Sequence, residues 1–184
     1  MGLTASGKST QAKRIAHFYG LKHYCGSVDL LRRLNHNDSN KSHWWFNEEG
    51  QNIELERDQA DVDLEVDERL LEIANTEDDY IFESWTTPFL YGRNDAIKIY
   101  LNPPLESRSK MAWNSKIEKS LSIESLVNGI KNKDTKSRDR FAKLYGIDIF
   151  STIGFQIVLD NSLLAQAQTS LILLQYISFF QKHQ

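Results

Sequence analysis

The sequence predicts an α/β protein in which a parallel sheet is packed between layers of helices, and two observations carry this prediction. Short apolar segments alternate with amphipathic segments along most of the 184 residues. Such alternation across short turns is typical of parallel βαβ units in one compact domain. Residues 2–9 read GLTASGKS and fit G-x-x-x-x-G-K-[ST], a phosphate-binding loop (P-loop) that joins a strand to a helix.

The composition is that of an ordinary globular protein, with 40% hydrophobic and 26% charged residues. A net charge of -3 argues against a nucleic-acid partner, which ordinarily requires a basic excess. The single cysteine, Cys25, excludes an internal disulfide and suits a reducing compartment. The longest apolar run, 171–180, is too short to span a bilayer, and the N-terminus lacks a signal-peptide pattern. We therefore expect a cytoplasmic monomer without a membrane partner.

The hydrophobic pattern predicts the elements in turn. A helix at 9–19 follows the phosphate loop, because its apolar residues share one face and Gly20 ends it. The polar segment 35–62 predicts loops and helix. The remaining helices are expected at 28–34, 63–76, from 105, 122–144 and 162–180, and the strands at 21–25, 80–82, 97–101 and 155–159.

Ligands of parallel sheets bind beyond the carboxyl ends of the strands. The residues directly after Cys25, Phe82, Leu101 and Leu159 are therefore expected to face one crevice together with the phosphate loop.

The glycines of the phosphate loop explain its expected chemistry. Gly2 and Gly7 let the backbone curl so that its N–H groups, and the start of the next helix, point at phosphate oxygens. Lys8 is expected to bridge the β- and γ-phosphates, and Ser9 to ligate Mg²⁺. The alternative is a chance Gly/Ser-rich start before a helix. The predicted nucleotide-binding residues are Gly2, Leu3, Thr4, Ala5, Ser6, Gly7, Lys8, Ser9 and Thr10.

The position of the loop is unusual, because such a loop follows a buried strand and only Met1 precedes it here. In this fold the preceding strand is central and buried on both faces. We therefore expect the natural protein to begin several residues upstream with a short β-branched run, with Met1 an internal or misassigned start.

Four later segments carry a family resemblance over nearly the whole chain. With the phosphate loop they resemble the nucleoside monophosphate kinases, most closely the archaeal-type cytidylate kinases. The resemblance implies one P-loop kinase domain over 1–184, with a monophosphate-binding segment at about 27–76 and a lid at about 108–143. The segments are DLLR at 29–32, IFESW at 81–85, IKIYLNPPLESR at 97–108 and RDRFAKLYGID at 138–148.

The resemblance implies roles for individual residues on the acceptor side. Asp29 and Arg32 match the Asp-x-x-Arg that contacts the acceptor monophosphate, and an arginine can grip a phosphate with two hydrogen bonds. Glu83 matches an acidic residue near the magnesium, which it could hold through water. Trp85 is expected at the substrate. For Asp29, Arg32 and Glu83 the alternative is a solvated surface charge.

The lid resemblance supplies a phosphate clamp of three cations, Arg108, Lys133 and Arg140, of which Lys133 matches only by charge. Such cations would neutralise charge on the transferred phosphoryl group. The sequence departs from the family pattern at several positions. Met111 and Ser115 replace basic lid residues, and Ser84-Trp85 replaces Gly-Arg, so an arginine that would help to read the acceptor is missing.

Other features leave alternatives open. Trp44, Trp45 and Phe46 could cover an acceptor base or form a hydrophobic plug, and the histidines show no metal-ligand spacing with Cys25. The expected function is phosphoryl transfer from ATP, with Mg²⁺, to a nucleoside monophosphate, most closely CMP or dCMP. The alternatives are a non-catalytic nucleotide-binding protein and a P-loop kinase for another small acceptor.

Overall fold

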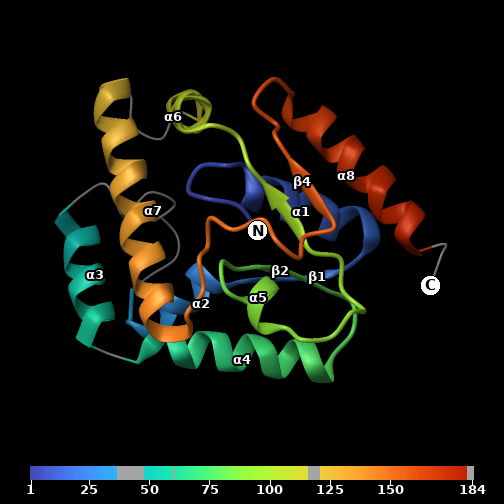
Figure 1. Ribbon diagram of the computed structural model, residues 1–184, viewed down its shortest axis with the longest axis horizontal. Coiled ribbons are helices and arrows are strands. Elements are labelled where there is room, and N and C mark those ends of the chain that lie inside the picture. Colours follow the sequence, from blue (N-terminus) through green and yellow to red (C-terminus); the bar gives the residue numbers. More distant parts are fainter. Residues whose placement is uncertain (37–47, 60, 116–120, 182–184) are drawn as a thin grey trace.

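The computed structural model describes residues 1–36, 48–59, 61–115 and 121–181. Parallel strands are flanked by helices (Figure 1), which confirms the predicted α/β class. The elements are α1 (Lys8–Tyr19), β1 (Lys22–Cys25), α2 (Gly26–Arg33), α3 (Glu48–Gln59), α4 (Val62–Thr76), β2 (Tyr80–Glu83), α5 (Thr87–Leu90), β3 (Ile99–Leu101), α6 (Leu105–Asn114), α7 (Ile123–Tyr145), β4 (Ile157–Leu159) and α8 (Gln166–Gln181).

The predicted elements are found with shifted ends. Strand β3 begins two residues later than expected, and α8 begins four residues later because residues 162–165 form a turn. The one-turn helix α5 was not predicted, and it begins with Pro88 in its first turn. The polar segment 35–62 contains α3, as expected, whereas Trp44, Trp45 and Phe46 lie outside the described residues.

The four strands form two parallel pairs, β1–β2 and β3–β4, rather than one continuous sheet. Figure 1 shows the N-terminus between the two pairs. The Met1 amine donates to Ile99 O over 2.7 Å, Leu101 N donates to Met1 O over 3.0 Å, and Gly2 bridges Leu101. Residues 1–2 therefore pair with β3, and the expectation of a strand ahead of Met1 is not tested.

Three apolar clusters hold the helices around the strands. Helices α1 and α8 pack on β3 through Ile15, Leu101, Leu173 and Ile177. A second cluster joins α2, α3 and α4, and a third joins α6 to α7 and includes Ala5 of the phosphate loop. The clusters place α2–α4 and α6–α7 beside the loop, where the predicted monophosphate-binding and lid segments lie.

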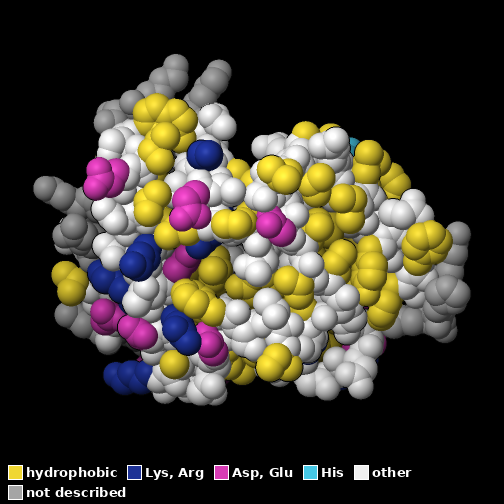
Figure 2. All heavy atoms as spheres, turned by 45° about the horizontal axis from the view of Figure 1, so that its top comes forward, with side chains coloured by type: hydrophobic (Ala, Val, Ile, Leu, Met, Phe, Trp, Pro, Cys, Tyr) yellow, Lys and Arg dark blue, Asp and Glu magenta, His cyan; other side chains and the backbone are white. Residues whose placement is uncertain are grey.

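The surface of α8 is apolar and uncharged. Leu171 and Phe179 are 67% and 52% exposed, and the helix contains no acidic or basic residue. Figure 2 shows hydrophobic side chains gathered on one side of the molecule, with lysines, arginines and carboxylates on the other. Among the described residues, no helix combines the length and apolar character needed to cross a membrane.

Candidate active site

The phosphate loop depends on its two glycines. A Cβ atom on Gly2 would lie 2.4 Å from Ser6 Oγ and 2.8 Å from the backbone oxygen of Leu101, so a side chain cannot fit. Gly7 has φ 87° at the start of α1, in the left-handed region that favours glycine. Ala5 also has positive φ, at 61°. This backbone places the start of α1 at the loop, as the sequence predicts.

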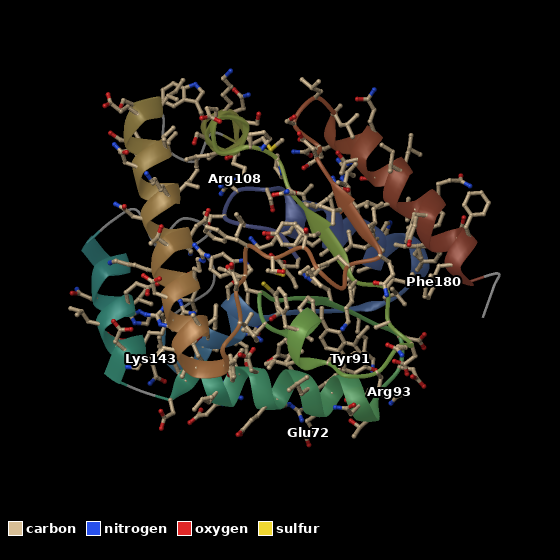
Figure 3. All side chains as sticks on the ribbon, viewed as in Figure 1. Glu72, Tyr91, Arg93, Arg108, Lys143 and Phe180 are labelled. Carbon is tan, nitrogen blue, oxygen red and sulfur yellow. The ribbon has the colours of Figure 1, made fainter. Side chains whose placement is uncertain are left out.

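Buried side chains anchor the loop from outside. Thr4 N donates to Asp134 Oδ1 over 3.0 Å, and Arg108 Nη1 donates to Thr4 O over 2.9 Å. Arg108 also pairs with Asp134 over 2.6 Å, between α6, α7 and the loop (Figure 3). From the segment before α8, Asn161 Nδ2 donates to Ser6 O over 3.3 Å. The loop is therefore tied to α6 and α7.

Lys8 extends from the start of α1 along the loop. Its ammonium group donates to Leu3 O over 3.4 Å and lies 5.8 Å from the centre of the Trp85 ring. The Trp85 indole donates in turn to Gly2 O over 2.9 Å. Trp85 thus contacts both the phosphate loop and the lysine.

Glu83, at the end of β2, meets the first turn of α1. Its carboxylate accepts a short hydrogen bond from Ser9 Oγ and lies 3.3 Å from His23 Nε2. Burial alone would raise the pKa of Glu83, but His23, the charge of Lys8 and the Ser9 hydroxyl together lower it to about 2. Glu83 is therefore an ionised carboxylate beside the phosphate loop.

The Ser9–Glu83 pair fits a magnesium ion bound with nucleotide. Glu83 Oε2 is buried and has the His23 contact over 3.3 Å but no hydrogen bond of normal geometry. Mg²⁺ is commonly held by a hydroxyl, one carboxylate, water and substrate phosphates, and Ser9 and Glu83 supply the first two. The described residues contain no cluster of three or more His, Cys, Asp or Glu suited to a metal.

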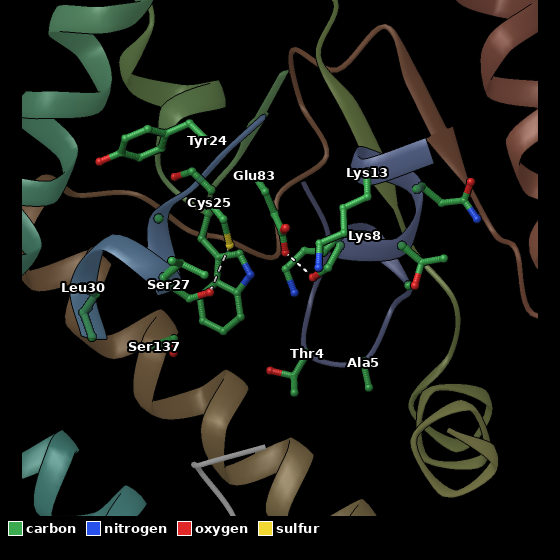
Figure 4. A pocket seen from close by; sticks show the side chains of 18 of the residues that line it. Thr4, Ala5, Lys8, Lys13, Tyr24, Cys25, Ser27, Leu30, Glu83 and Ser137 are labelled. Atoms are coloured by element: carbon green, nitrogen blue, oxygen red, sulfur yellow. Dashed lines mark hydrogen bonds between the residues drawn. The ribbon is translucent and has the colours of Figure 1, made fainter. Parts of the chain in front are cut away.

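The phosphate loop and the ends of several strands line one cavity of about 820 Å³. Figure 4 shows Lys8, Cys25 and Glu83 around it, with Thr4 and Ala5 on the loop. The sequence predicts that the residues after Cys25, Phe82, Leu101 and Leu159 face one crevice. Gly26 and Glu83, each one residue after its predicted strand end, line the cavity, and so does Asn161, two residues after Leu159. Asn102, directly after Leu101, does not line it. Three of the four strand ends thus meet at one site.

The predicted acceptor residues lie on α2 at this cavity. Asp29 and Arg32 both line it, and Arg32 is exposed. Asp29 Oδ2 accepts hydrogen bonds from Tyr24 OH over 2.6 Å and Arg33 Nε over 3.0 Å. Asp29 therefore orders the strand-to-helix junction, and Arg32 presents a guanidinium group beside the cavity.

The chain is 32% identical to a cytidylate kinase of Desulfurococcus amylolyticus, over 89% of this chain and 82% of the relative. It is 30% identical to a cytidylate kinase of Methanopyrus kandleri, over 94% and 88%. The chain belongs to the cytidylate kinase family. This confirms the family resemblance and the prediction of an enzyme of the nucleoside monophosphate kinase class.

Solved structures agree on the fold. An uncharacterized protein from Eubacterium ventriosum is similar with a TM-score of 0.63 at 13% identity, covering 96% of this chain and 94% of its own. A shikimate kinase from Acinetobacter baumannii, in complex with shikimate, is similar with a TM-score of 0.55 at 17% identity, covering 96% and 89%. At these identities the similarity shows the fold alone. No family model matches the chain.

The three predicted lid cations of this cytidylate kinase family member have different surroundings. Lys133 lines the cavity, and burial, with the nearby charges of Arg57 and Lys8, lowers its pKa to about 7. Arg108 is buried against Asp134 and does not line the cavity. Arg140 also lies off the cavity, paired with Glu54 over 2.8 Å and Asp58 over 2.5 Å.

The family resemblance did not point to several buried polar residues at the cavity. Arg57 binds Asp63 through Nε and Nη2, the shorter contact being 2.6 Å. Asp67, one turn further along α4, accepts hydrogen bonds from Thr86 and Tyr145. The available signal was that both aspartates share the buried face of α4, where carboxylates are rare unless they have a partner or a function.

Cys25 ends β1 inside the same cavity. Its thiol lies 3.3 Å from Ser27 Oγ, and burial, together with the nearby Glu83 carboxylate, raises its pKa. At neutral pH the thiol is therefore protonated and weakly nucleophilic.

Proposed function

We propose that the protein transfers the γ-phosphoryl group of ATP, bound with Mg²⁺, to CMP or dCMP. The observation that carries this proposal is that the phosphate loop and Arg32 line one cavity. Donor and acceptor phosphates can therefore meet there without a covalent intermediate, because positioning and electrostatics do the catalytic work in phosphoryl transfer. The names of the cytidylate kinase relatives support cytidine as the base.

The proposed donor site consists of residues 2–10. The backbone N–H groups and Lys8 would hold the phosphates, and Ser9 with Glu83 would hold Mg²⁺. The metal would neutralise phosphate charge and align the reacting oxygens. A Glu83 carboxylate that stays ionised down to a pH of about 2 supports this role.

The proposed acceptor site uses Arg32, positioned by the α2 segment that Asp29 orders, with Trp85 beside Lys8. Lys133 already lines the cavity and would stabilise the transferring group. We assign the same role to Arg108 and Arg140. Arg140 would have to exchange its acidic partners on α3 for phosphate, which implies a movement of α7 relative to α3.

The remaining proposals concern organisation. We propose one kinase domain, with the monophosphate-binding segment at 27–76 and the lid at 108–143, acting as a cytoplasmic monomer without nucleic-acid or membrane partners. For the fold, we propose that the helices and strands form three layers, with the parallel strands between two layers of helices.

The test is a coupled assay of ADP formation with ATP, Mg²⁺ and a panel of nucleoside monophosphates. We expect turnover with CMP and dCMP and the loss of nearly all activity in Lys8→Ala, because the charge that bridges the donor phosphates is removed. Lys136→Ala is the matched control, because Lys136 is an exposed lysine of α7 away from the cavity. Turnover only with a different small acceptor, or full activity in Lys8→Ala, would contradict the proposal.

A further inference from the structure

A second set of polar side chains lines the cavity on α4 and next to α5, away from the residues assigned above. Asp67 is its centre, with a relative exposure of 7%. Thr86 Oγ1 donates to Asp67 Oδ1 over 2.5 Å, and Tyr145 OH donates to Asp67 Oδ2 over 2.9 Å. Because each carboxylate oxygen can accept two hydrogen bonds, one lone pair on each oxygen remains for a ligand.

The charge of Asp67 is not balanced by a cation in the part of the chain that the structure describes. The nearest candidate, Arg57, is instead bound to Asp63 through Nε and Nη2. A buried carboxylate without an ion-pair partner is costly for a fold that gains nothing from it. Its place in a cavity wall points to a ligand that donates hydrogen bonds.

Flat apolar surfaces stand in the same wall. The rings of Trp85 and Phe141 meet edge to face with centres 6.2 Å apart, and Val66 lies one residue before Asp67. Apolar walls with a few fixed polar groups are typical of sites for a planar heterocycle. The carboxylate would then contact the polar edge of the ring.

We propose that Asp67 selects the acceptor base, favouring bases with an exocyclic amine, such as cytosine, over bases with a carbonyl at that position, such as uracil. The inference rests on the proposed function. An exocyclic amine donates a hydrogen bond to the Asp67 carboxylate. A carbonyl oxygen at the same position has no hydrogen to donate, so its lone pairs would repel those of the carboxylate. Sites built to bind a donor strongly reject analogues that lack it, because the buried acceptor is left unpaired.

The ionisation of Asp67 agrees with this role. Its pKa is raised to about 6, chiefly by burial and also by the charge of Asp63, against the opposing effects of the Thr86 and Tyr145 hydrogen bonds and the charge of Arg57. Above this pH Asp67 is an acceptor only. Below it the neutral acid can donate to a carbonyl, so discrimination between the two classes of base should fade.

The decisive variant is Asp67→Asn, which keeps the size of the side chain and replaces one acceptor oxygen with a donor. We expect the ratio of kcat/KM for CMP to that for UMP to fall by roughly 10–100-fold, as for a lost charge-assisted hydrogen bond. AMP has an exocyclic amine where IMP has a carbonyl, so these purines repeat the comparison on a larger ring. If the enzyme turns them over, the ratio of kcat/KM for AMP to that for IMP should also fall in Asp67→Asn.

Asp95→Asn is the matched control, because Asp95 is bound to Tyr91 and Arg93 outside the cavity. It should leave the CMP:UMP ratio unchanged. Titration calorimetry with a non-hydrolysable ATP analogue should give the same affinity for both variants and the wild type. An altered donor affinity in Asp67→Asn would mean general damage and would overturn a role confined to the base.

A second measurement needs no variant. The wild-type CMP:UMP ratio should be constant above about pH 7 and fall as the pH decreases through 6. Titration of the acceptor phosphate and of Lys133 affects both substrates and cancels in the ratio. A flat profile, or an unchanged ratio in Asp67→Asn, would overturn the inference.

The failure of the proposed function gives a different result. If the wild type phosphorylates no monophosphate, calorimetry with CMP and UMP still measures the preference in binding. A CMP preference that Asp67→Asn removes would support the inference alone. Turnover of CMP with no role for Asp67 would support the proposed function alone.

Discussion

Glu83 has a place both in the proposed magnesium site and in the buried hydrogen bonding around the phosphate loop. The replacement Glu83→Gln removes the charge but keeps the shape of a side chain that is bonded to Ser9. Under the proposed function, we expect a higher half-saturating concentration of Mg²⁺ and a kcat lower by at least about 10-fold, because the proposed metal-holding carboxylate is lost. Magnesium titration of ADP formation measures both effects.

The pH dependence of unfolding offers an independent check on Glu83. Its pKa in the folded state, about 2, lies below the ordinary value of 4.5, so the group stabilises the fold above pH 4.5. That contribution is lost as the pH falls from 4.5 towards 2, and Glu83→Gln should flatten this part of the profile. Glu77→Gln, at an exposed pair with Lys22, is the control and should change it little.

At the scale of single residues, the sequence indicated four residues that the structure brings to one cavity. Lys8, Arg32 and Glu83 were indicated by a motif or a family position and Lys133 by its charge, and all four line the cavity. Asp67 escaped prediction, because its importance arises from tertiary packing between α4, α5 and α7. Local sequence reports that a carboxylate lies on an apolar face, but not which neighbours reach it.

Among the elements, α6 and α7 hold the phosphate loop through one buried ion pair. Arg108 and Asp134 together bind both backbone polar groups of Thr4. Removing one partner leaves the other buried and unpaired, which costs much more than the pair contributes. The link of α6 and α7 to the phosphate loop therefore depends on both residues being present.

Asp134→Ala should lower the free energy of unfolding by about 3–5 kcal/mol, whereas the double variant Arg108→Met/Asp134→Leu should recover part of the loss. Urea unfolding measures both. Asp148→Ala breaks the exposed Arg138–Asp148 pair, 47% and 45% accessible, and should cost less than about 1 kcal/mol. Equal losses at the two sites would contradict a specific role for the buried pair.

The boundaries of elements show where sequence periodicity loses information. Long amphipathic helices such as α4 and α7 were predicted to within one or two residues, because many apolar positions define each face. The four-residue helix α5 contains too few residues to show a period, and Thr86 and Pro88 alone set its start. Short elements are therefore defined by their tertiary contacts.

For the whole molecule, the sequence predicted the class of fold but not the pairing of strands. The order of elements was sufficient to indicate parallel βαβ units. The strands pair as β1–β2 and β3–β4, and Met1 and Gly2 pair with β3, through long-range hydrogen bonds that no local pattern encodes. The alignment with the two cytidylate kinases spans most of the chain.

The uncharged helix α8 should govern solubility without affecting catalysis. Replacing the exposed Leu171 and Phe179 with lysine should raise the ammonium sulfate concentration needed for precipitation and leave ADP formation unchanged. Stability should change by no more than about 0.5 kcal/mol per site. Leu173→Lys on the same helix is the contrasting variant, because Leu173 is 1% exposed and its charge would disrupt the core. Unaltered precipitation would count against the prediction.

The cysteine at the end of β1 has a practical consequence. Because the sequence contains one cysteine and that cysteine lines the cavity, a single thiol-directed label reports from inside the site without any engineered position. A fluorine tag or a small spin probe on Cys25 would stand next to Glu83 and Ser27. The protein thus carries its own attachment point for spectroscopy of substrate entry.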